Sequence, residues 1–197
     1  MLNVPGVLWT DANCNTRMID LTTRLLCDRI IMCTGEINDA LAESITSQLL
    51  YLEAEDKKKP IKMFINSPGG SVLAGLSIIS MMESISCPVH TIISGLAASM
   101  GIVIAASGKK GERSVYPLSR IMLHQVSGGY SGTIQDSKIN YKEMETLNDM
   151  VFEHLSKCCS KPSDEIKNTC QRDSWYSPEE IIKYGLVDKI ITSHKTL

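Results

Sequence analysis

The chain has 197 residues, of which 43% are hydrophobic, and a formal net charge of -2 at pH 7. Such a chain can bury one sizeable core, so we expect a single domain over residues 1–197. The slightly acidic balance offers no basic surface for nucleic acid or an anionic membrane, and no apolar run approaches the roughly 18 residues of a membrane-spanning helix. We therefore expect a soluble protein with neither nucleic-acid nor membrane partners.

The cysteine pattern indicates a reducing compartment. The chain has seven cysteines, an odd number, and none of them form a C-x-x-C pair. No secretory signal pattern is found at the N-terminus. Such cysteines are typical of reduced thiols in a cytosol-like compartment, so we predict a cytoplasmic protein.

The sequence predicts a first strand–helix unit after an initial helix. Apolar residues at helical spacing predict that this initial helix begins at Asn38 or Asp39. A short apolar segment at Ile61–Asn66 then predicts a buried strand. It is followed by a tight turn at Ser67–Ser71 and by a helix with an apolar stripe over Leu73–Ile85.

The same order of elements then repeats. Val89–Ser94 predicts a strand, Gly95–Ser99 a turn of small residues, and Met100–Ala106 a buried helix. Two strand–helix units in succession are typical of a parallel sheet, because a crossover helix connects each parallel strand to the next. We therefore expect an α/β fold.

Ser99 occupies the junction between the second predicted strand unit and its helix. A residue at that junction lies at the carboxyl edge of the sheet, where α/β proteins place ligands, and beside the free N–H groups of a helix N-terminus. A serine there is suited to be a nucleophile. The alternative is an N-cap, which is the more common role of serine before an apolar helix.

His124 is the candidate base that such a nucleophile needs. It ends an apolar run and precedes a turn-rich loop, so its imidazole can face the same edge as Ser99. The alternative is a core histidine bonded to a backbone carbonyl. His90 begins a strand, His154 borders an apolar helical stripe and His194 lies near the C-terminus, so none of these three suits the role.

The orienting carboxylate cannot be chosen from spacing alone. The downstream aspartates are Asp136, Asp149, Asp164, Asp173 and Asp188. Asp173 lies in a non-periodic stretch before a helix that Ser177 and Glu180 begin as a capping box. A connecting loop is a reasonable location for a functional carboxylate, but the alternatives stay open at this point.

Several motifs, taken together, resemble the proteolytic subunits of the Clp protease family. They are I-N-S-P-G-G-S-V at Ile65–Val72, G-L-A-A-S-M-G at Gly95–Gly101, I-M-L-H-Q at Ile121–Gln125, R-D-S-W-Y-S at Arg172–Ser177 and Y-G-L-V-D-K at Tyr184–Lys189. The resemblance extends almost from end to end. Separate motifs in the same order make it specific.

The resemblance implies a serine endopeptidase that needs no metal or organic cofactor. It makes Ser99 the nucleophile, His124 the general base and then acid, and Asp173 the group that orients the imidazole. The backbone N–H groups of Gly70 and Met100 would form the oxyanion hole. The residue types agree, because glycine permits a close backbone approach and Met100 is a first-turn donor.

The family's substrates are unfolded polypeptides that bind as an added strand. The residues implied to contact them are Gly69, Ser71, Val72, Gln125 and Val126. The implied fold has repeated β-β-α units, as in the crotonase group, with a protruding helical handle.

The resemblance also implies a barrel of fourteen subunits in two stacked seven-membered rings, fed by a ring-shaped AAA+ ATP-driven unfoldase. About residues 1–16 would line the pore, about residues 126–159 would form the handle between the rings, and the rest would form the head. By composition alone the first segment is a mobile tail, and the handle helix is an ordinary surface helix.

The sequence departs from the family pattern near these sites. Gln171 replaces an aspartate next to Arg172, Val126 replaces a proline, Thr133 replaces a glutamine, and Cys170 is unusual. These departures raise the hypothesis of a weakly active or structural subunit that needs a second paralogue. A third possibility is a crotonase-like acyl-CoA enzyme, although such enzymes do not need this serine, histidine and aspartate set.

Overall fold

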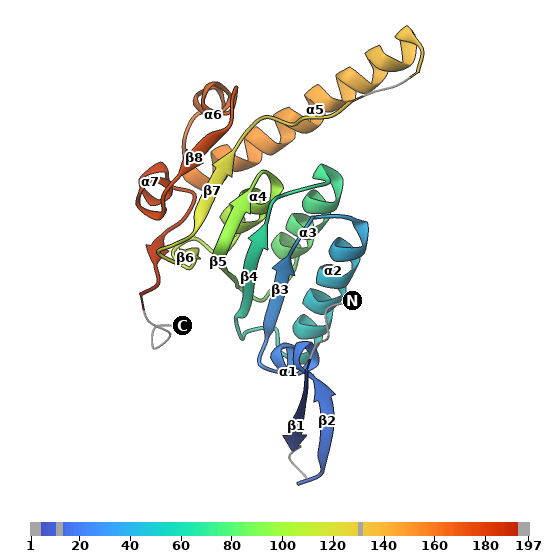
Figure 1. Cartoon of the computed structure of the whole chain (residues 1–197), viewed down its shortest axis with the longest axis vertical. Helices are drawn as coiled ribbons and strands as arrows, with labels where there is room; N and C mark the ends of the chain where they lie inside the picture. The colour runs from blue at the N-terminus through green and yellow to red at the C-terminus, as the bar shows by residue number, and fades with distance from the viewer. Residues whose placement is uncertain (1–4, 11–13, 130–131, 193–197) are drawn as a thin grey trace.

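The computed structural model describes residues 5–10, 14–129 and 132–192, and it has a mixed α/β fold (Figure 1). Within these residues seven strands form one sheet, and two further strands pair separately as a hairpin. The predicted α/β fold is therefore confirmed.

The main sheet is built largely from parallel strands. Its strands are β3 (Ile30–Thr34), β4 (Ile61–Ser67), β5 (Val89–Ala98), β6 (Ser114–Val115), β7 (Arg120–Leu123), β8 (Ser174–Tyr176) and β9 (Lys189–Ile190). The parallel order is β3, β4, β5, β6 and β9. β7 runs parallel to the second half of β5, and β8 pairs antiparallel with β7.

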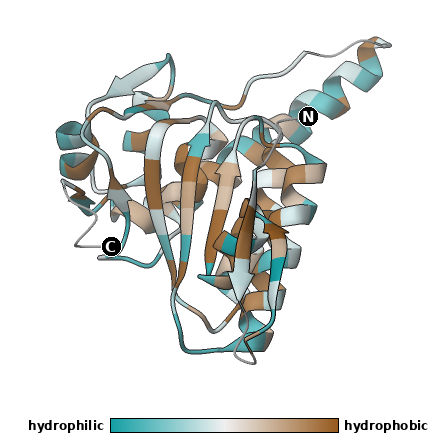
Figure 2. Ribbon diagram, turned by 60° about the horizontal axis from the view of Figure 1, so that its bottom comes forward, coloured by the Kyte–Doolittle hydropathy of each residue, from teal (hydrophilic) through white to brown (hydrophobic). Residues whose placement is uncertain are grey.

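Helices cover the sheet and extend beyond it. They are α1 (Leu21–Cys27), α2 (Asp39–Glu55), α3 (Val72–Ser84), α4 (Met100–Ala106), α5 (Ile134–Cys159), α6 (Ser163–Thr169) and α7 (Pro178–Tyr184). α2, α3 and α4 lie side by side on one face of the sheet, and Figure 2 shows hydrophobic residues concentrated on the strands and on the helices behind them.

The core lies between the sheet and these helices. Ile31, Ile65 and Ile93, on three neighbouring strands, are fully buried, as are Ile45 and Leu49 of α2. Each such side chain contributes about 1.5–3 kcal/mol when it is removed from water. Isoleucine suits the strands, because its branched side chain fits a pleated surface.

Most of the predicted elements are confirmed, and one is wrong. α4 has the predicted bounds, and Asn38 is the N-cap of α2, since its side chain accepts from Leu41 N–H. The predicted turn at Gly95–Ser99 is instead largely strand, because β5 continues to Ala98.

The physical reason is a change of partner along β5. Its first half pairs with β6 through Ile92 and Ile93, and its second half pairs with β7 through Leu96–Ala98. Gly95, with φ +104°, lies between the two halves and lets the backbone bend there. Small residues therefore mark a bend in a strand here, not its end.

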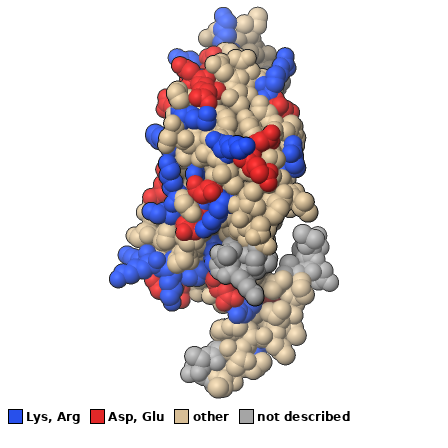
Figure 3. Space-filling view, turned by 90° about the vertical axis from the view of Figure 1, so that its left-hand side faces the viewer, with Lys and Arg blue, Asp and Glu red and all other residues tan. Residues whose placement is uncertain are grey.

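The N-terminal region also differs from the tail that composition indicated. β1 (Gly6–Thr10) and β2 (Thr16–Asp20) form an antiparallel hairpin that projects from one end of the molecule (Figure 1). The guanidinium of Arg17 lies 4.9 Å from the ring centre of Trp9 across this hairpin. On the face shown in Figure 3, acidic and basic side chains are interspersed, and the projecting hairpin is largely uncharged.

α5 is the longest helix and projects from the opposite end (Figure 1). It begins at Ile134, directly after Thr133, which forms a capping box with Asp136. Its buried residues, which include Phe152, lie in its C-terminal half, whereas Ile139 in the projecting half is 61% exposed. Among the described helices, none has the length and apolar character needed to span a bilayer.

Candidate active site

Ser99 lies between β5 and α4 in a strained backbone conformation. Its φ is +54° and its ψ is -124°, a region that residues other than glycine rarely adopt. Ser99 occupies the N-cap position of α4, but its side chain makes no capping hydrogen bond to the helix. Its N–H donates to Met122 O at 2.9 Å, which fixes the serine against β7.

His124 lies beside Ser99 because β7 pairs with β5. Ala98 and Met122 are register partners in the two strands, so the residues that follow them emerge at the same edge of the sheet. The distance from His124 Nε2 to Ser99 Oγ is 2.8 Å, a good hydrogen bond. The sequence-based expectation that the imidazole faces the same edge as Ser99 agrees with this geometry.

Asp173 lies next to His124 because β8 pairs with β7. Leu123 and Ser174 are register partners, which places Asp173 beside the histidine. Its Oδ1 lies 3.5 Å from His124 Nδ1, longer than an ideal hydrogen bond, and the aspartate side chain is 64% exposed. We call Ser99, His124 and Asp173 the Ser99 site. A hydroxyl, an imidazole and a carboxylate in this order can generate and protonate a nucleophile.

Gly70 lies in a bridge to Ile37 that only a glycine can form. Ile37 N–H donates to Gly69 O at 2.8 Å, and Ser71 N–H donates to Ile37 O at 2.7 Å. The Gly70 N–H takes no part in this bridge. A Cβ on Gly70 would lie 2.2 Å from Ile37 O, and its φ is +146°.

A second backbone donor lies at the start of α4. Met100 is the first residue of that helix, where geometry leaves the N–H without a helical acceptor. The glycine-rich turn passes close to it, since a Cβ on Gly69 would lie 3.2 Å from Met100 N and 2.6 Å from Ser99 Cβ. Gly70 and Met100 therefore border the same space as Ser99.

That space is a small cavity of about 50 Å³. Gly70, Met100 and Ser99 line it together with His124, Gln125 and Val126, and Val72 also borders it. Most of its other lining residues are apolar, among them Val151 and Leu155. The side chain of Ser71, a predicted substrate-contacting residue, caps α3 by accepting from Ala74 N–H.

The other predicted candidate aspartates lie in other parts of the structure, and Asp164 is in the first turn of α6. Asp188 binds Arg113 at 2.6 Å; burial acts to raise the pKa of this carboxyl, but its hydrogen bonds to Arg113 lower it overall. Asp149 pairs with Lys167 at 2.9 Å, and Asp136 caps α5. Asp173 is therefore the aspartate that faces the imidazole.

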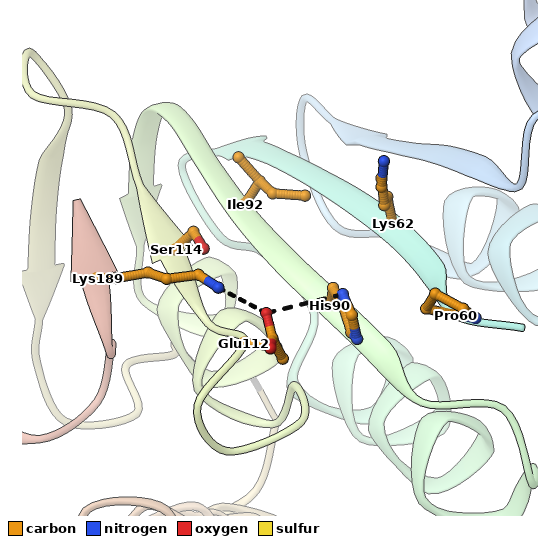
Figure 4. Close-up of a pocket in the computed structure, with 7 residues that line it drawn as sticks. All are labelled: Pro60, Lys62, His90, Ile92, Glu112, Ser114 and Lys189. Carbon is orange, nitrogen blue, oxygen red and sulfur yellow. Dashed lines mark hydrogen bonds and ion pairs between the residues drawn. The ribbon is translucent and has the colours of Figure 1, made fainter. Parts of the chain in front are cut away.

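His90 lies in a different pocket, shown in Figure 4. This pocket has a volume of about 340 Å³ and contains none of the predicted site residues. Glu112 lies 2.6 Å from Lys189 Nζ and 4.0 Å from His90 Nδ1. Burial lowers the pKa of His90. His194 lies outside the described residues.

The cysteines do not offer a competing nucleophile near the site. All seven are free thiols, and burial raises the pKa of Cys33 and of Cys170 to about 12. A thiol with such a pKa stays protonated at neutral pH and reacts poorly. Within the residues that the structure describes, no group of three His, Cys, Asp or Glu side chains is placed to hold a metal ion.

Sequence reasoning missed two residues that contact the segment after His124. Asn148 Oδ1 accepts from Val126 N–H at 2.9 Å, and Cys170 O accepts from Gln125 N–H at 2.9 Å. Asn148 gave only a weak signal, a polar residue near the apolar stripe of a long helix. The backbone carbonyl of Cys170 gave none.

Comparison with known proteins is consistent with this geometry. The family model described as Clp protease matches residues 13–194. The ATP-dependent Clp protease proteolytic subunit 2 of Chlamydia pneumoniae is 43% identical over 195 residues, covering 99% of this chain and 96% of that protein. The proteolytic subunit of Leuconostoc citreum is 45% identical over 190 residues, covering 95% and 94%. The chain therefore belongs to the Clp protease family, a family of serine peptidases.

Proposed function

We propose that this chain is the proteolytic subunit of an ATP-dependent Clp protease, with Ser99 as its nucleophile. The observation that carries the proposal is the 2.8 Å contact between Ser99 Oγ and His124 Nε2 at the edge of the sheet. The strained backbone of Ser99 adds support, since such strain is concentrated at functional sites.

In the proposed reaction, His124 Nε2 accepts the hydroxyl proton while Ser99 Oγ attacks the carbonyl carbon of a peptide bond. Asp173 keeps the other ring nitrogen protonated and stabilises the imidazolium that forms. The backbone N–H groups of Gly70 and Met100 donate to the oxyanion of the tetrahedral intermediate. His124 then protonates the leaving amine. In the second half of the reaction His124 accepts a proton from a water molecule, which attacks the acyl-enzyme, and then returns the proton to Ser99 Oγ.

The proposed substrates are unfolded polypeptides bound as an added strand. The Gly69–Val72 segment and the Gln125–Val126 segment would flank the peptide and bond to its main chain, which gives affinity without strict sequence requirements. The cavity beside Ser99, whose walls include Val72, Val151 and Leu155, would receive an apolar side chain of the residue before the cleaved bond.

For the assembly, we propose a single peptidase domain with a crotonase-like head, a handle at about residues 126–159 and a pore segment at about residues 1–16. Two seven-membered rings would stack through α5, whose exposed Ile134, Ile139 and Tyr141 are unusual for a surface helix. An AAA+ unfoldase would feed this barrel in the cytoplasm, and the relatives are named ATP-dependent Clp protease subunits, which supports this partner.

The two alternative functions find less support. An inactive structural subunit would not need Ser99 and His124 in hydrogen-bonding contact. The Gln171 side chain is exposed and its amide donates to Asn168 Oδ1 at 3.4 Å, so within one subunit this departure leaves the contact between Ser99 and His124 in place. An acyl-CoA enzyme is disfavoured by the family to which the chain belongs.

Ser99→Ala tests the proposal directly. We expect the rate of peptide hydrolysis to fall by a factor of about 10⁴ or more, because no other group supplies the nucleophile. Native mass spectrometry of the same samples checks that the oligomer is unchanged. A fluorophosphonate probe should label Ser99 in the wild type and nothing in the variant.

Ser107→Ala is the matched control, since Ser107 Oγ also contacts a histidine nitrogen, at 2.7 Å. It should keep both hydrolysis and labelling. Wild-type protein that neither hydrolyses peptides nor reacts with the probe, alone or with a second paralogue, would contradict the proposal.

A further inference from the structure

The backbone that follows His124 is fixed by two other elements. Gln125 N–H donates to the carbonyl of Cys170, which ends α6, and Val126 N–H donates to the side chain of Asn148 on α5. Both distances are 2.9 Å. Two consecutive residues after the histidine are therefore bound from different sides.

Val126 is also part of the wall of the cavity beside Ser99. The same cavity is lined by Val151 and Leu155 of α5. Asn148 precedes Val151 by three positions, so these residues lie on one face of the helix. The hydrogen bond from Val126 to Asn148 therefore sets the distance between the loop wall and the helix wall of the cavity.

The bond to Asn148 gives the backbone N–H of Val126 an acceptor. Valine has a backbone N–H that proline lacks, and an N–H shielded from water needs an acceptor. Val126 and Asn148 are both half-buried. The next residue along the helix, Asp149, forms a separate and largely exposed ion pair with Lys167 of α6 at 2.9 Å, so it takes no part in the bond to Val126.

We propose that Asn148 is a positioning residue of the peptidase, which sets the preference for the substrate side chain next to the cleaved bond. It acts through Val126, whose place defines one wall of the cavity, and does not touch the reacting atoms. The inference rests on the proposed function, because it assigns this cavity to the substrate residue before the cleaved bond.

The test compares two peptides that differ only in that residue, alanine in one and leucine in the other. Asn148→Leu keeps the volume and removes the acceptor. We expect the ratio of kcat/KM between the two peptides to change by about 5- to 10-fold, mostly through KM. Asp149→Asn is the matched control: it breaks the adjacent ion pair, leaves the Val126 bond in place and should keep the wild-type ratio.

Two further variants separate positioning from folding. Asn148→Asp retains an acceptor oxygen and should restore the wild-type preference, and Asn148→Ser, whose hydroxyl is too short, should shift it if Asn148→Leu does not fold. In a Val126→Pro background, which has no N–H at this position, changing Asn148 should no longer alter the ratio.

An unchanged ratio in folded Asn148→Leu and Asn148→Ser would overturn the inference, as would an equal loss for both peptides. Fluorophosphonate labelling of Ser99 in every variant keeps this result apart from the proposed function. A wild type that is neither labelled nor active would refute the peptidase itself, and with it this inference.

Discussion

A second serine, histidine and carboxylate cluster lies elsewhere in the molecule, with nearly the same distances as the Ser99 site. Ser107 Oγ lies 2.7 Å from His154 Nε2, and His154 Nδ1 lies 3.8 Å from Glu83 Oε1. We call these three residues the Ser107 cluster. The corresponding distances in the Ser99 site are 2.8 and 3.5 Å. Distances between side chains therefore do not distinguish the two.

The two serines occupy opposite ends of α4. Ser99 precedes the first residue of the helix, where N–H groups are free and the dipole is positive, whereas Ser107 is the C-cap, where carbonyls face outward. Developing negative charge is stabilised at the first end and repelled at the second. The backbone around a serine thus decides whether a serine–histidine pair can act.

The hydroxyl protons also differ. Ser107 Oγ donates to Val103 O at 2.7 Å, so its proton is already bound and His154 can only donate to the oxygen. Ser99 Oγ has only the His124 nitrogen as a partner within the described residues. The Ser107 cluster is therefore a structural contact that joins α3, α4 and α5.

Asp173→Asn should give the largest difference in activity between the Ser99 site and the Ser107 cluster. An amide at this position no longer stabilises the imidazolium and favours the wrong tautomer of His124, so we expect kcat/KM to fall by about 10² to 10⁴. The exposure of Asp173 places the effect toward the lower end. Glu83→Gln, the same change in the Ser107 cluster, should alter kcat/KM by less than about twofold, measured by peptide hydrolysis.

Equal losses in the two variants would mean that the clusters are not functionally distinct. A loss in Asp173→Asn that is accompanied by a smaller oligomer in native mass spectrometry would point to assembly and away from the imidazole.

Glycine substitutions test whether the backbone beside Ser99 has a catalytic role that the backbone beside Ser107 lacks. In Gly70→Ala the new Cβ would meet Ile37 O, so the bridge must shift and the N–H beside Ser99 moves with it. Loss of one oxyanion donor typically lowers kcat by about 10² to 10³. We expect a reduction of that size in kcat, with KM little changed.

Gly108→Ala is the control next to Ser107. Its Cβ would lie 2.4 Å from Thr91 Oγ1, so it is also crowded, but no oxyanion donor is nearby. It should lower the melting temperature and leave kcat within about twofold. If Gly70→Ala loses only stability, as its control does, the Gly70 N–H is not an oxyanion donor.

Secondary structure was predicted correctly where the apolar pattern was strong, and it was predicted wrongly where pairing with a distant strand determines the conformation. Met100–Ala106 is apolar throughout and became the helix expected from its composition. Gly95–Ala98 was expected as a turn because small residues are common in turns, but its pairing with β7 makes it a strand. Long-range pairing overrides local propensity in such segments.

For the site, sequence patterns alone placed the serine and the histidine at one edge of the sheet, but they did not identify the carboxylate or the contacts that support the histidine. Ser99 was expected at a strand–helix junction and His124 at the end of an apolar run, so both were expected at the same edge of the sheet. Asp173 could not be chosen among several aspartates without the resemblance, because its place depends on the short strand β8 pairing with β7. The Asn148 contact depends on a side chain from a distant helix, and no local pattern encodes it.

The smallest expected effect is on stability, and it comes from His154, whose titration in the Ser107 cluster makes folding stability depend on pH. Burial lowers the pKa of His154 below its usual value, and the nearby Glu83 carboxylate offsets this only in part. The folded protein therefore binds fewer protons than the unfolded chain at mildly acid pH. The stability that neutral His154 contributes is present above the unfolded pKa of about 6.5 and declines as the pH falls toward the lower folded value.

His154→Gln removes this titrating group and keeps a side-chain amide that can donate to Ser107. Melting temperatures at fixed protein concentration, between pH 7.5 and 5.5, should fall less steeply for the variant than for the wild type. Part of the slope will remain, because burial also lowers the pKa of His90. Peptide hydrolysis at pH 7.5 should be unchanged, since the Ser107 cluster acts on stability alone. Identical slopes, or a loss of hydrolysis in folded protein, would show that the two clusters are coupled.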